Sequence, residues 1–193
     1  MDSSLIRSNI SRYVALDDRE IEFLESILIP RPFKQGELIV KGGEQARYLM
    51  FVNSGYLMTY YSDKDGADHV IQFAAAGWWA GDIYSLSKEP YTLYTTKALC
   101  DGELLLLPRP AQHQLFENYN KFERYFRLVF QNSVIKHQLR FVESHTQPAE
   151  QRYLLFTATY PNMEKYVAQK YIASYLGITP EFLSKVRKKL LQK

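Results

Sequence analysis

The sequence is poor in the residues that build covalent and metal-based sites. Its 193 residues include one cysteine, Cys100, which excludes a disulfide within the chain and any zinc or iron–sulfur site made of cysteines alone. Only one of the four histidines, His69, falls in a predicted strand, so the three-histidine set of a metal-dependent β-barrel enzyme is absent. There is no glycine-rich phosphate loop and no nucleophile motif. We therefore expect no enzymatic activity, no metal and no other cofactor.

Long apolar runs are also missing. No stretch reaches the roughly 18 consecutive apolar residues that a membrane-spanning helix needs, and residues 1–14 lack the continuous apolar segment of a signal peptide. The hydrophobic fraction of 46% is nevertheless enough to build a core in one large or two small domains. These features predict a cytoplasmic protein with no membrane partner.

The first part of the chain has the pattern of a β domain preceded by helices. Residues 3–28 are helical in character, and Pro30 and Pro32 end that segment. Glycines then recur at positions 36, 43, 55, 66 and 77, and the Asp65-Gly66 pair is typical of a hairpin turn. The strand-like runs between them are 37–40, 48–52, 56–61, 69–73, 93–99 and 104–107. A sheet of this size is expected to close into a β-roll, also called a jelly roll, within an α+β protein.

A long helix is predicted over residues 121–143, after a short one that ends near Asn118. Steps of three and four residues connect Tyr125, Leu128, Asn132, Ile135, Leu139 and Val142. This heptad seam predicts a homodimer in which two copies of the helix pair, with the polar Asn132 fixing the register. A neighbouring stripe of Phe122, Phe126 and Val129 is expected to pack on the β-roll. The alternative is a helix whose seam is buried against its own domain.

The C-terminal segment that begins at Gln169 has the pattern of a helix-turn-helix. Ala173 allows two helices to cross closely, and Gly177 follows four residues later at the turn. Thr179 suits the N-cap of the second helix, with Pro180 in the first helical position and Glu181 beside the positive end of the helix dipole. The buried side consists of Ile172, Leu176, Ile178, Leu183 and Val186. The alternative is an ordinary corner between two helices.

A polar stripe remains on the outside of the second predicted helix. It consists of Pro180, Glu181, Ser184, Lys185 and Lys188. Residues 163–193 carry seven basic and two acidic side chains, a net charge of +5, whereas the whole chain carries +3. Because the positive charge lies at this end, the stripe is expected to enter the major groove of double-stranded DNA, with Lys189 adding to the basic surface.

The order of β-roll, long helix and helix-turn-helix closely resembles the Crp/Fnr family of bacterial transcription regulators over nearly the whole chain. The marks of the resemblance are Lys34-Gln35-Gly36-Glu37, Gly55, Asp65-Gly66, the 77–82 segment GWWAGD and the helix-turn-helix. The resemblance implies a winged-type helix-turn-helix, a small-molecule effector in the β-roll and RNA polymerase as a partner. It also implies that Glu181 and Lys185 read bases and that Lys170 and Thr179 contact phosphates. Residues 161–167 are short for the β-hairpin wing that is usual in the family.

The expected effector pocket departs from the form that binds cyclic AMP. Relatives that bind this nucleotide hold its ribose with a Gly-Glu pair and neutralise its phosphate with an arginine about ten residues later. Here the pair is Gly81-Asp82, residues 83–96 contain no arginine, and Lys88 is followed at once by Glu89. Since a buried phosphate charge needs a partner, we expect no response to cyclic AMP.

The remaining pocket residues leave the effector open. The candidates are Gly81, Asp82, Ile83, Tyr84, Tyr94, Thr95 and Thr96. They suit a neutral or weakly polar ligand of unknown identity, or a filled core that binds nothing.

These features predict three parts: a β-roll effector-type domain (1–118), a dimerisation helix (119–145) and a helix-turn-helix domain (146–193). The predicted function is a homodimeric, sequence-specific transcription regulator. The alternative is an effector-binding or interaction module whose helix-turn-helix no longer reads DNA.

Overall fold

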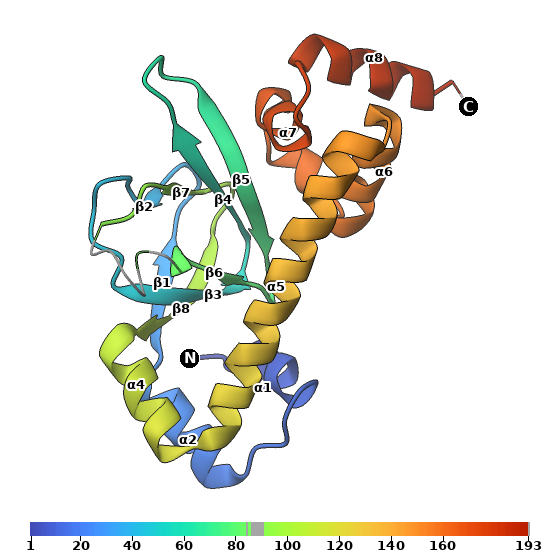
Figure 1. The fold of residues 1–193 in the computed structure, drawn as a ribbon. Helices are drawn as coiled ribbons and strands as arrows, with labels where there is room; N and C mark the ends of the chain where they lie inside the picture. Colours follow the sequence, from blue (N-terminus) through green and yellow to red (C-terminus); the bar gives the residue numbers. More distant parts are fainter. Residues whose placement is uncertain (84, 86–90, 193) are drawn as a thin grey trace.

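Two short helices and an edge strand open the computed structural model, which describes residues 1–83, 85 and 91–192 (Figure 1). Helix α1 spans Ser4–Ser11 and α2 spans Asp18–Ile27. Asp17 caps α2 by accepting a hydrogen bond from the Glu20 amide at 3.0 Å, while the Glu20 carboxylate accepts one from the Asp17 amide at 2.8 Å. This capping box explains why α2 begins where it does.

The two prolines that end the helical segment lie in a strand that the sequence pattern does not predict. Strand β1, Ile29–Phe33, contains Pro30 and Pro32 and pairs with β8, Gly102–Pro108, at the edge of its sheet. An edge strand tolerates proline because the missing N–H group can face solvent instead of a neighbouring strand.

The β-roll consists of two antiparallel four-stranded sheets, in the orders β1-β8-β3-β6 and β2-β7-β4-β5. The other strands are β2 (Leu38–Val40), β3 (Tyr48–Ser54), β4 (Tyr56–Ser62), β5 (Asp68–Ala75), β6 (Trp79–Ala80) and β7 (Thr95–Ala98). Residues from both sheets, including Val52, Leu57 and Leu104, are fully buried between them. The predicted jelly roll is therefore confirmed, with β1 and β6 as additional strands.

A single long helix connects the β-roll to the C-terminal part of the chain. Helix α4, Arg109–Asn118, leads into α5, Asn120–Thr146. Helix α5 runs past the β-roll to the helices at the C-terminal end of the chain (Figure 1). Its first turns are buried through Phe122, Tyr125 and Phe126, whereas most of the helix beyond Gln131 is exposed.

The predicted place of Tyr125 on a free seam of this helix is wrong. Tyr125 is fully buried in its own chain, where its hydroxyl donates to Asn9 Oδ1 at 2.6 Å and accepts from Trp79 Nε1 at 2.7 Å. Burial raises the pKa of this phenol well above its ordinary value. Tyr125 therefore anchors α5 to the β-roll and to the N-terminal helix α1.

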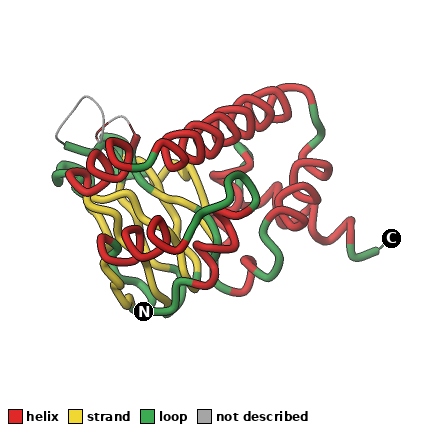
Figure 2. The backbone as a smooth tube through the Cα atoms, turned by 90° about the horizontal axis from the view of Figure 1, so that it is seen from below, coloured by secondary structure: helices red, strands yellow, loops and turns green. Residues whose placement is uncertain are grey.

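The C-terminal body consists of helices only (Figure 2). It comprises α6 (Ala149–Thr159), the short 3₁₀ helix η1 (Met163–Lys165), α7 (Gln169–Leu176) and α8 (Pro180–Leu190). The winged form implied by the family resemblance is not observed, because the described residues 161–167 hold a single 3₁₀ turn where a β-hairpin would stand. Too few residues separate α6 from α7 to form two paired strands.

The C-terminal helices share a hydrophobic core with the β-roll. The ring of Phe73 on β5 packs against three aromatic rings of the C-terminal helices. The distances between ring centroids are 5.8 Å to Phe156, 5.8 Å to Tyr160 and 5.2 Å to Tyr175. The hydroxyl of Ser174 on α7 accepts the Val70 amide hydrogen at 2.9 Å and donates to the Asp68 carbonyl at 3.0 Å, so α7 is hydrogen-bonded to β5. In the part of the chain that is described, no helix has the length and apolarity that a membrane span requires.

Candidate nucleic-acid interface and ligand cavity

The turn between α7 and α8 has the geometry that the sequence predicts. Gly177 adopts φ 66° and ψ 38°, the left-handed conformation that ends a helix, and its amide donates to carbonyls of the last turn of α7. Glycine is favoured here because a side chain is strained at this φ. Thr179 accepts the Phe182 amide hydrogen at 3.2 Å as the N-cap of α8, and Pro180 follows in the first helical turn. The two helices therefore form a helix-turn-helix in which the direction of α8 is fixed locally.

The opposite faces of α8 differ in burial and charge. Leu183 is fully buried and Val186 nearly so, which attaches the helix to α6 and α7. The predicted stripe is exposed on the other side along its whole length, and it consists of Pro180, Glu181, Ser184, Lys185 and Lys188. Thr179 is exposed next to it. Helix α8 lies at the outer end of the C-terminal body (Figure 1), so a duplex could approach this exposed stripe.

The carboxylate of Glu181 is stabilised in its charged form. Two hydrogen bonds lower the pKa of this carboxyl group. The larger contribution comes from its own backbone amide, and the smaller one comes from the Thr179 side chain. A carboxylate held in this position can accept a hydrogen bond from the exocyclic amine of cytosine in the major groove.

Two of the other predicted DNA contacts have partners within the chain. Lys170, at the start of α7, is exposed, with its ammonium 4.7 Å from the ring centroid of Tyr171. Lys189 donates to the Glu150 carboxylate of α6. A phosphate contact by Lys189 therefore requires this ion pair to open, whereas Lys185 and Lys188 on the same helix have no ion pair with any described residue.

The structure adds an apolar residue to this surface that sequence reasoning missed. Phe182 lies next to Glu181 in the first turn of α8 and is 49% exposed. An aromatic ring near the tip of a recognition helix can contact the methyl group of thymine. The helical spacing could have predicted its exposure, because Phe182 does not share a face with the buried Leu183 and Val186.

A second candidate site is a cavity of about 550 Å³ in the β-roll. It is lined by β2 and β4, by residues 44–48 and 50, and by residues 81–82, 91–92, 94 and 96. Four of the predicted pocket residues line it: Gly81, Asp82, Tyr94 and Thr96. Arg47 and Glu44 also line it from the segment before β3, and sequence reasoning missed both because they are distant from the Gly-Asp pair along the chain.

Two of the described pocket candidates, Ile83 and Thr95, are not brought to this cavity. Ile83 lines a different cavity, described below, and Thr95 accepts the Gly42 amide hydrogen at 3.0 Å without lining the β-roll cavity. Tyr84 lies outside the described residues, as do Lys88 and Glu89. Within residues 1–83, 85 and 91–192, no group of three His, Cys, Asp or Glu side chains is placed to hold a metal ion.

Asp82, which stands in place of a ribose-binding glutamate, is engaged by its own chain. Its Oδ2 accepts hydrogen bonds from Thr92 Oγ1 and from Ser85 Oγ, both at 2.7 Å. Ser85 Oγ also lies 2.9 Å from the Tyr91 carbonyl oxygen, so the single hydroxyl hydrogen is shared between the two acceptors. Ser85 is fully buried, and Thr92 is buried as well. Thr92 follows Asp82 by ten residues, the spacing at which the phosphate-binding arginine is expected. At this spacing the chain has a neutral residue, and its hydroxyl bonds the Asp82 carboxylate.

The exposed part of α5 carries an apolar surface. Ile135, Leu139 and Val142 of the predicted seam are all more than two-fifths exposed. Val134 and Phe141, which were not predicted, extend this surface, and Phe141 is 67% exposed. Asn132 donates to the Tyr13 hydroxyl at 3.3 Å, and Leu128 is half-buried. We call Val134, Ile135, Leu139, Phe141 and Val142 the α5 surface.

Comparisons with known proteins agree with this architecture. Residues 30–119 match the family model of the cyclic nucleotide-binding domain. No curated protein matches the sequence significantly.

Solved structures with the same fold cover most of the chain. The c-di-GMP-responsive regulator CLP of Xanthomonas campestris has a TM-score of 0.72 at 15% identity, covering 91% of this chain and 92% of its own. FixK2 of Bradyrhizobium japonicum has a TM-score of 0.72 at 18% identity, with coverages of 86% and 85%. A regulator from Eubacterium rectale assigned to the Crp/Fnr family has a TM-score of 0.71 at 16% identity, with coverages of 91% and 84%. Residues 30–119 are thus similar to the cyclic nucleotide-binding domain, and the chain as a whole has the fold of Crp/Fnr regulators.

Proposed function

We propose that this protein is a transcription regulator of the Crp/Fnr type that binds specific DNA sequences as a homodimer. The observation that carries the proposal is the exposed stripe of α8, which includes Lys185 and Lys188. The opposite side of this helix is attached to α6 and α7 through Leu183 and Val186. By family resemblance, RNA polymerase is the expected protein partner and the cytoplasm the expected location.

The proposed contacts divide into two groups. Glu181, Phe182 and Lys185, near the N-terminal end of α8, read base edges in the major groove. Lys170, Thr179 and Lys188 contact phosphates and position the helix. Because lysine makes a point-charge contact where arginine would make two parallel hydrogen bonds, Lys185 is expected to discriminate guanine only moderately.

The test is DNA selection followed by binding measurements. Genomic fragments bound by the protein should share a pseudo-palindrome whose half-sites lie about one helical turn apart. On the selected duplex, Glu181→Ala should reduce the preference at one base pair per half-site about tenfold. Lys170→Ala should weaken binding to selected and scrambled duplexes alike and should make the dependence on salt less steep.

The matched control is Arg19→Ala, which also removes a positive charge from an exposed position, on α2 at the end of the molecule opposite to α8 (Figure 1). It should leave both affinities unchanged. An equal loss on selected and scrambled DNA in Glu181→Ala would show that this residue does not read bases. No binding to any genomic fragment would favour the alternative, an interaction module without DNA recognition.

We further propose that cyclic AMP is not the effector. Supporting this are the neutral Thr92 at the spacing expected for the arginine and the hydrogen bonds that already hold Asp82. The described charged residues of the cavity are one cation, Arg47, and two carboxylates, Glu44 and Asp82. A cyclic phosphate would therefore enter a lining without an excess of positive charge, which disfavours binding.

A further inference from the structure

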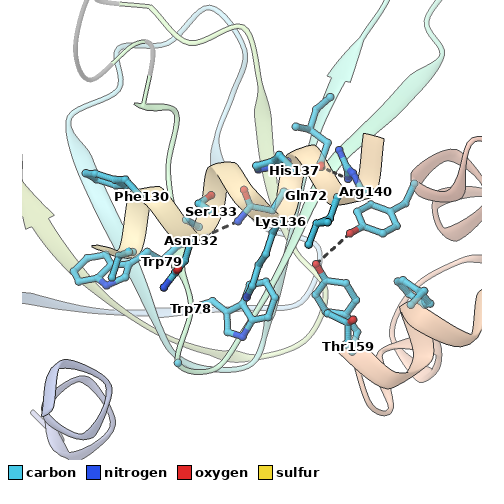
Figure 3. A pocket seen from close by; sticks show the side chains of 18 of the residues that line it. Gln72, Trp78, Trp79, Phe130, Asn132, Ser133, Lys136, His137, Arg140 and Thr159 are labelled. Atoms are coloured by element: carbon cyan, nitrogen blue, oxygen red, sulfur yellow. Dashed lines mark hydrogen bonds between the residues drawn. The ribbon is translucent and has the colours of Figure 1, made fainter. Parts of the chain in front are cut away.

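A second cavity, of about 420 Å³, lies where α5, the β-roll and the C-terminal helices meet (Figure 3). Its volume is within the range of small-molecule sites. Aromatic side chains from three parts of the chain form its walls: Trp78 from the β-roll, Tyr160 after α6, and Tyr175 from α7. It shares only Gly81 with the β-roll cavity, so it is a separate site.

The polar part of the cavity is cationic. Arg12, Lys136, Arg140 and Arg152 line it, against the single described carboxylate of Glu143. Lys136 extends from α5 toward Trp78, with its ammonium 4.1 Å from the ring centroid (Figure 3). Arg140 lies 4.6 Å from the ring centroid of Tyr175 and donates to the Ile71 carbonyl at 2.6 Å. Such a combination of aromatic walls and cations is complementary to an anion with an apolar body.

Arg152 lines the cavity and is hydrogen-bonded to the end of α7. Its Nη1 donates to the Leu176 carbonyl at the end of α7. Its Nε is buried and is the one buried side-chain nitrogen or oxygen that lacks a hydrogen-bond partner among the described residues. Because this nitrogen has almost no accessible surface, the contribution of Arg152 to the cavity is the positive charge of its guanidinium group.

The cavity lies on a face of α5 that adjoins the proposed dimer seam, and Asn132 and Leu139 belong to both. Lys136 and Arg140 line it and are four residues apart, so they lie on one face of the helix. Ile135, Phe141 and Val142 of the α5 surface do not line it and are exposed elsewhere on the helix. A partner helix paired through the α5 surface would therefore contact the rim of the cavity at Leu139.

We propose that this cavity binds a small organic carboxylate with an aromatic body. Its carboxylate pairs with Lys136 in a lining that also carries the positive charges of Arg140 and Arg152, and its ring packs on the aromatic side chains of the walls. Arg152 also bonds the Leu176 carbonyl directly before Gly177, so the bound anion acts on the turn that fixes the direction of α8. Binding itself does not depend on the DNA-binding function proposed above.

The two tryptophans of the chain allow a direct test. Trp78 and Trp79 both line the cavity, so intrinsic tryptophan fluorescence reports on it. The 193-residue protein, without DNA, is titrated with benzoate, phenylacetate and 3-phenylpropanoate, and with the neutral amide 3-phenylpropanamide. At least one carboxylate should give a saturable change. The amide should bind at least about tenfold more weakly than 3-phenylpropanoate, because it loses charge-assisted hydrogen bonds.

Three variants locate the site. Lys136→Gln removes a cation from the lining at an exposed position, so it should fold and should weaken carboxylate binding about tenfold. Arg152→Gln removes another cation from the lining and should also weaken binding. Arg127→Gln removes a charge from an exposed position of the same helix outside the lining, and should leave the affinity unchanged.

Three results would each overturn the proposal. They are equal affinity for 3-phenylpropanoate and its amide, equal losses in Lys136→Gln and Arg127→Gln, and no saturable response to any of the three carboxylates. None of these measurements involves DNA, so failure of this site is distinguishable from failure of the proposed regulatory function.

Discussion

Replacing Ile135 by glutamate should dissociate the proposed homodimer. Ile135 is 43% exposed on α5, and Leu139 is a poorer choice because it also lines the cationic cavity. Full burial of an aliphatic or aromatic side chain contributes about 1.5–3 kcal/mol. Since roughly half of each side chain in the α5 surface remains exposed, its burial in an interface would contribute about 1 kcal/mol.

The apolar burial expected at the dimer interface can be compared with the free-energy cost of association. The α5 surface, present once in each protomer, would contribute about 10 kcal/mol to a two-fold dimer. Association costs about 4–15 kcal/mol in lost freedom of movement, so the dimer depends on most of this surface. Ile135→Glu occurs twice in a symmetric interface, loses about 2 kcal/mol of apolar burial and buries two carboxylates. The dimer dissociation constant should therefore rise at least about 30-fold.

Analytical ultracentrifugation over a range of concentrations provides the measurement. The matched control is Ile29→Glu, the same substitution at a residue of β1 that is 46% exposed and does not belong to the α5 surface. It should leave the dimer intact. DNA affinity should fall in Ile135→Glu, because a single half-site offers fewer contacts. A wild-type protein that sediments as a monomer at micromolar concentration, or equal behaviour of the two variants, would refute the reasoning.

Three further changes test the turn, the effector and the alkaline stability. Thr179→Ala removes the N-cap of α8 and should lower the free energy of unfolding by about 1 kcal/mol in urea titrations; an unchanged value would contradict the cap. Cyclic AMP at millimolar concentration should not raise the melting temperature, whereas a ligand at a hundred times its Kd would stabilise the fold by about 2.7 kcal/mol; a clear increase would contradict our interpretation of Asp82 and Thr92. Burial is the main cause that raises the pKa of Tyr153 from its ordinary value of 10.0 to about 12, and the hydrogen bond to Glu164 is the second cause. The folded chain then retains a proton that the unfolded chain loses, so this stabilisation, complete below pH 10, should be lost as pH rises toward 12. Urea unfolding at pH 9 and pH 11 should show a smaller fall in Tyr153→Phe than in the wild type.

The helix-turn-helix could be predicted from the sequence because its signals are local. Gly177, Thr179 and Pro180 each act within four residues of their own position, through a left-handed turn, a cap and a fixed φ. The structure reproduces all three. The jelly roll was predictable for a similar reason, since strands and the Asp65-Gly66 turn are defined by short patterns, although the edge strand β1 was hidden by its two prolines.

The position of Tyr125 could not be predicted because its partners are distant in sequence. A heptad pattern shows which residues share a face of a helix, but not which neighbour covers that face. Tyr125 is separated by 116 residues from Asn9 and by 46 from Trp79, and these two side chains satisfy its hydroxyl inside the core. The same limit applies to Arg47 in the β-roll cavity and to Arg152 in the cationic one, since each is brought to its site by folding.

The contact between β5 and α7 was also invisible in the sequence, and it bears on how the protein could be regulated. Ser174 bonds two backbone groups of β5, and Tyr175 packs on Phe73 of the same strand, so the first helix of the helix-turn-helix is held by the β-roll. Arg152 holds the other end of α7 through the Leu176 carbonyl. The orientation of α8 therefore depends on two sets of contacts, one from the β-roll and one from α6. A ligand in either cavity needs to favour one arrangement of these contacts by only a few kcal/mol to change the fraction of molecules able to bind DNA.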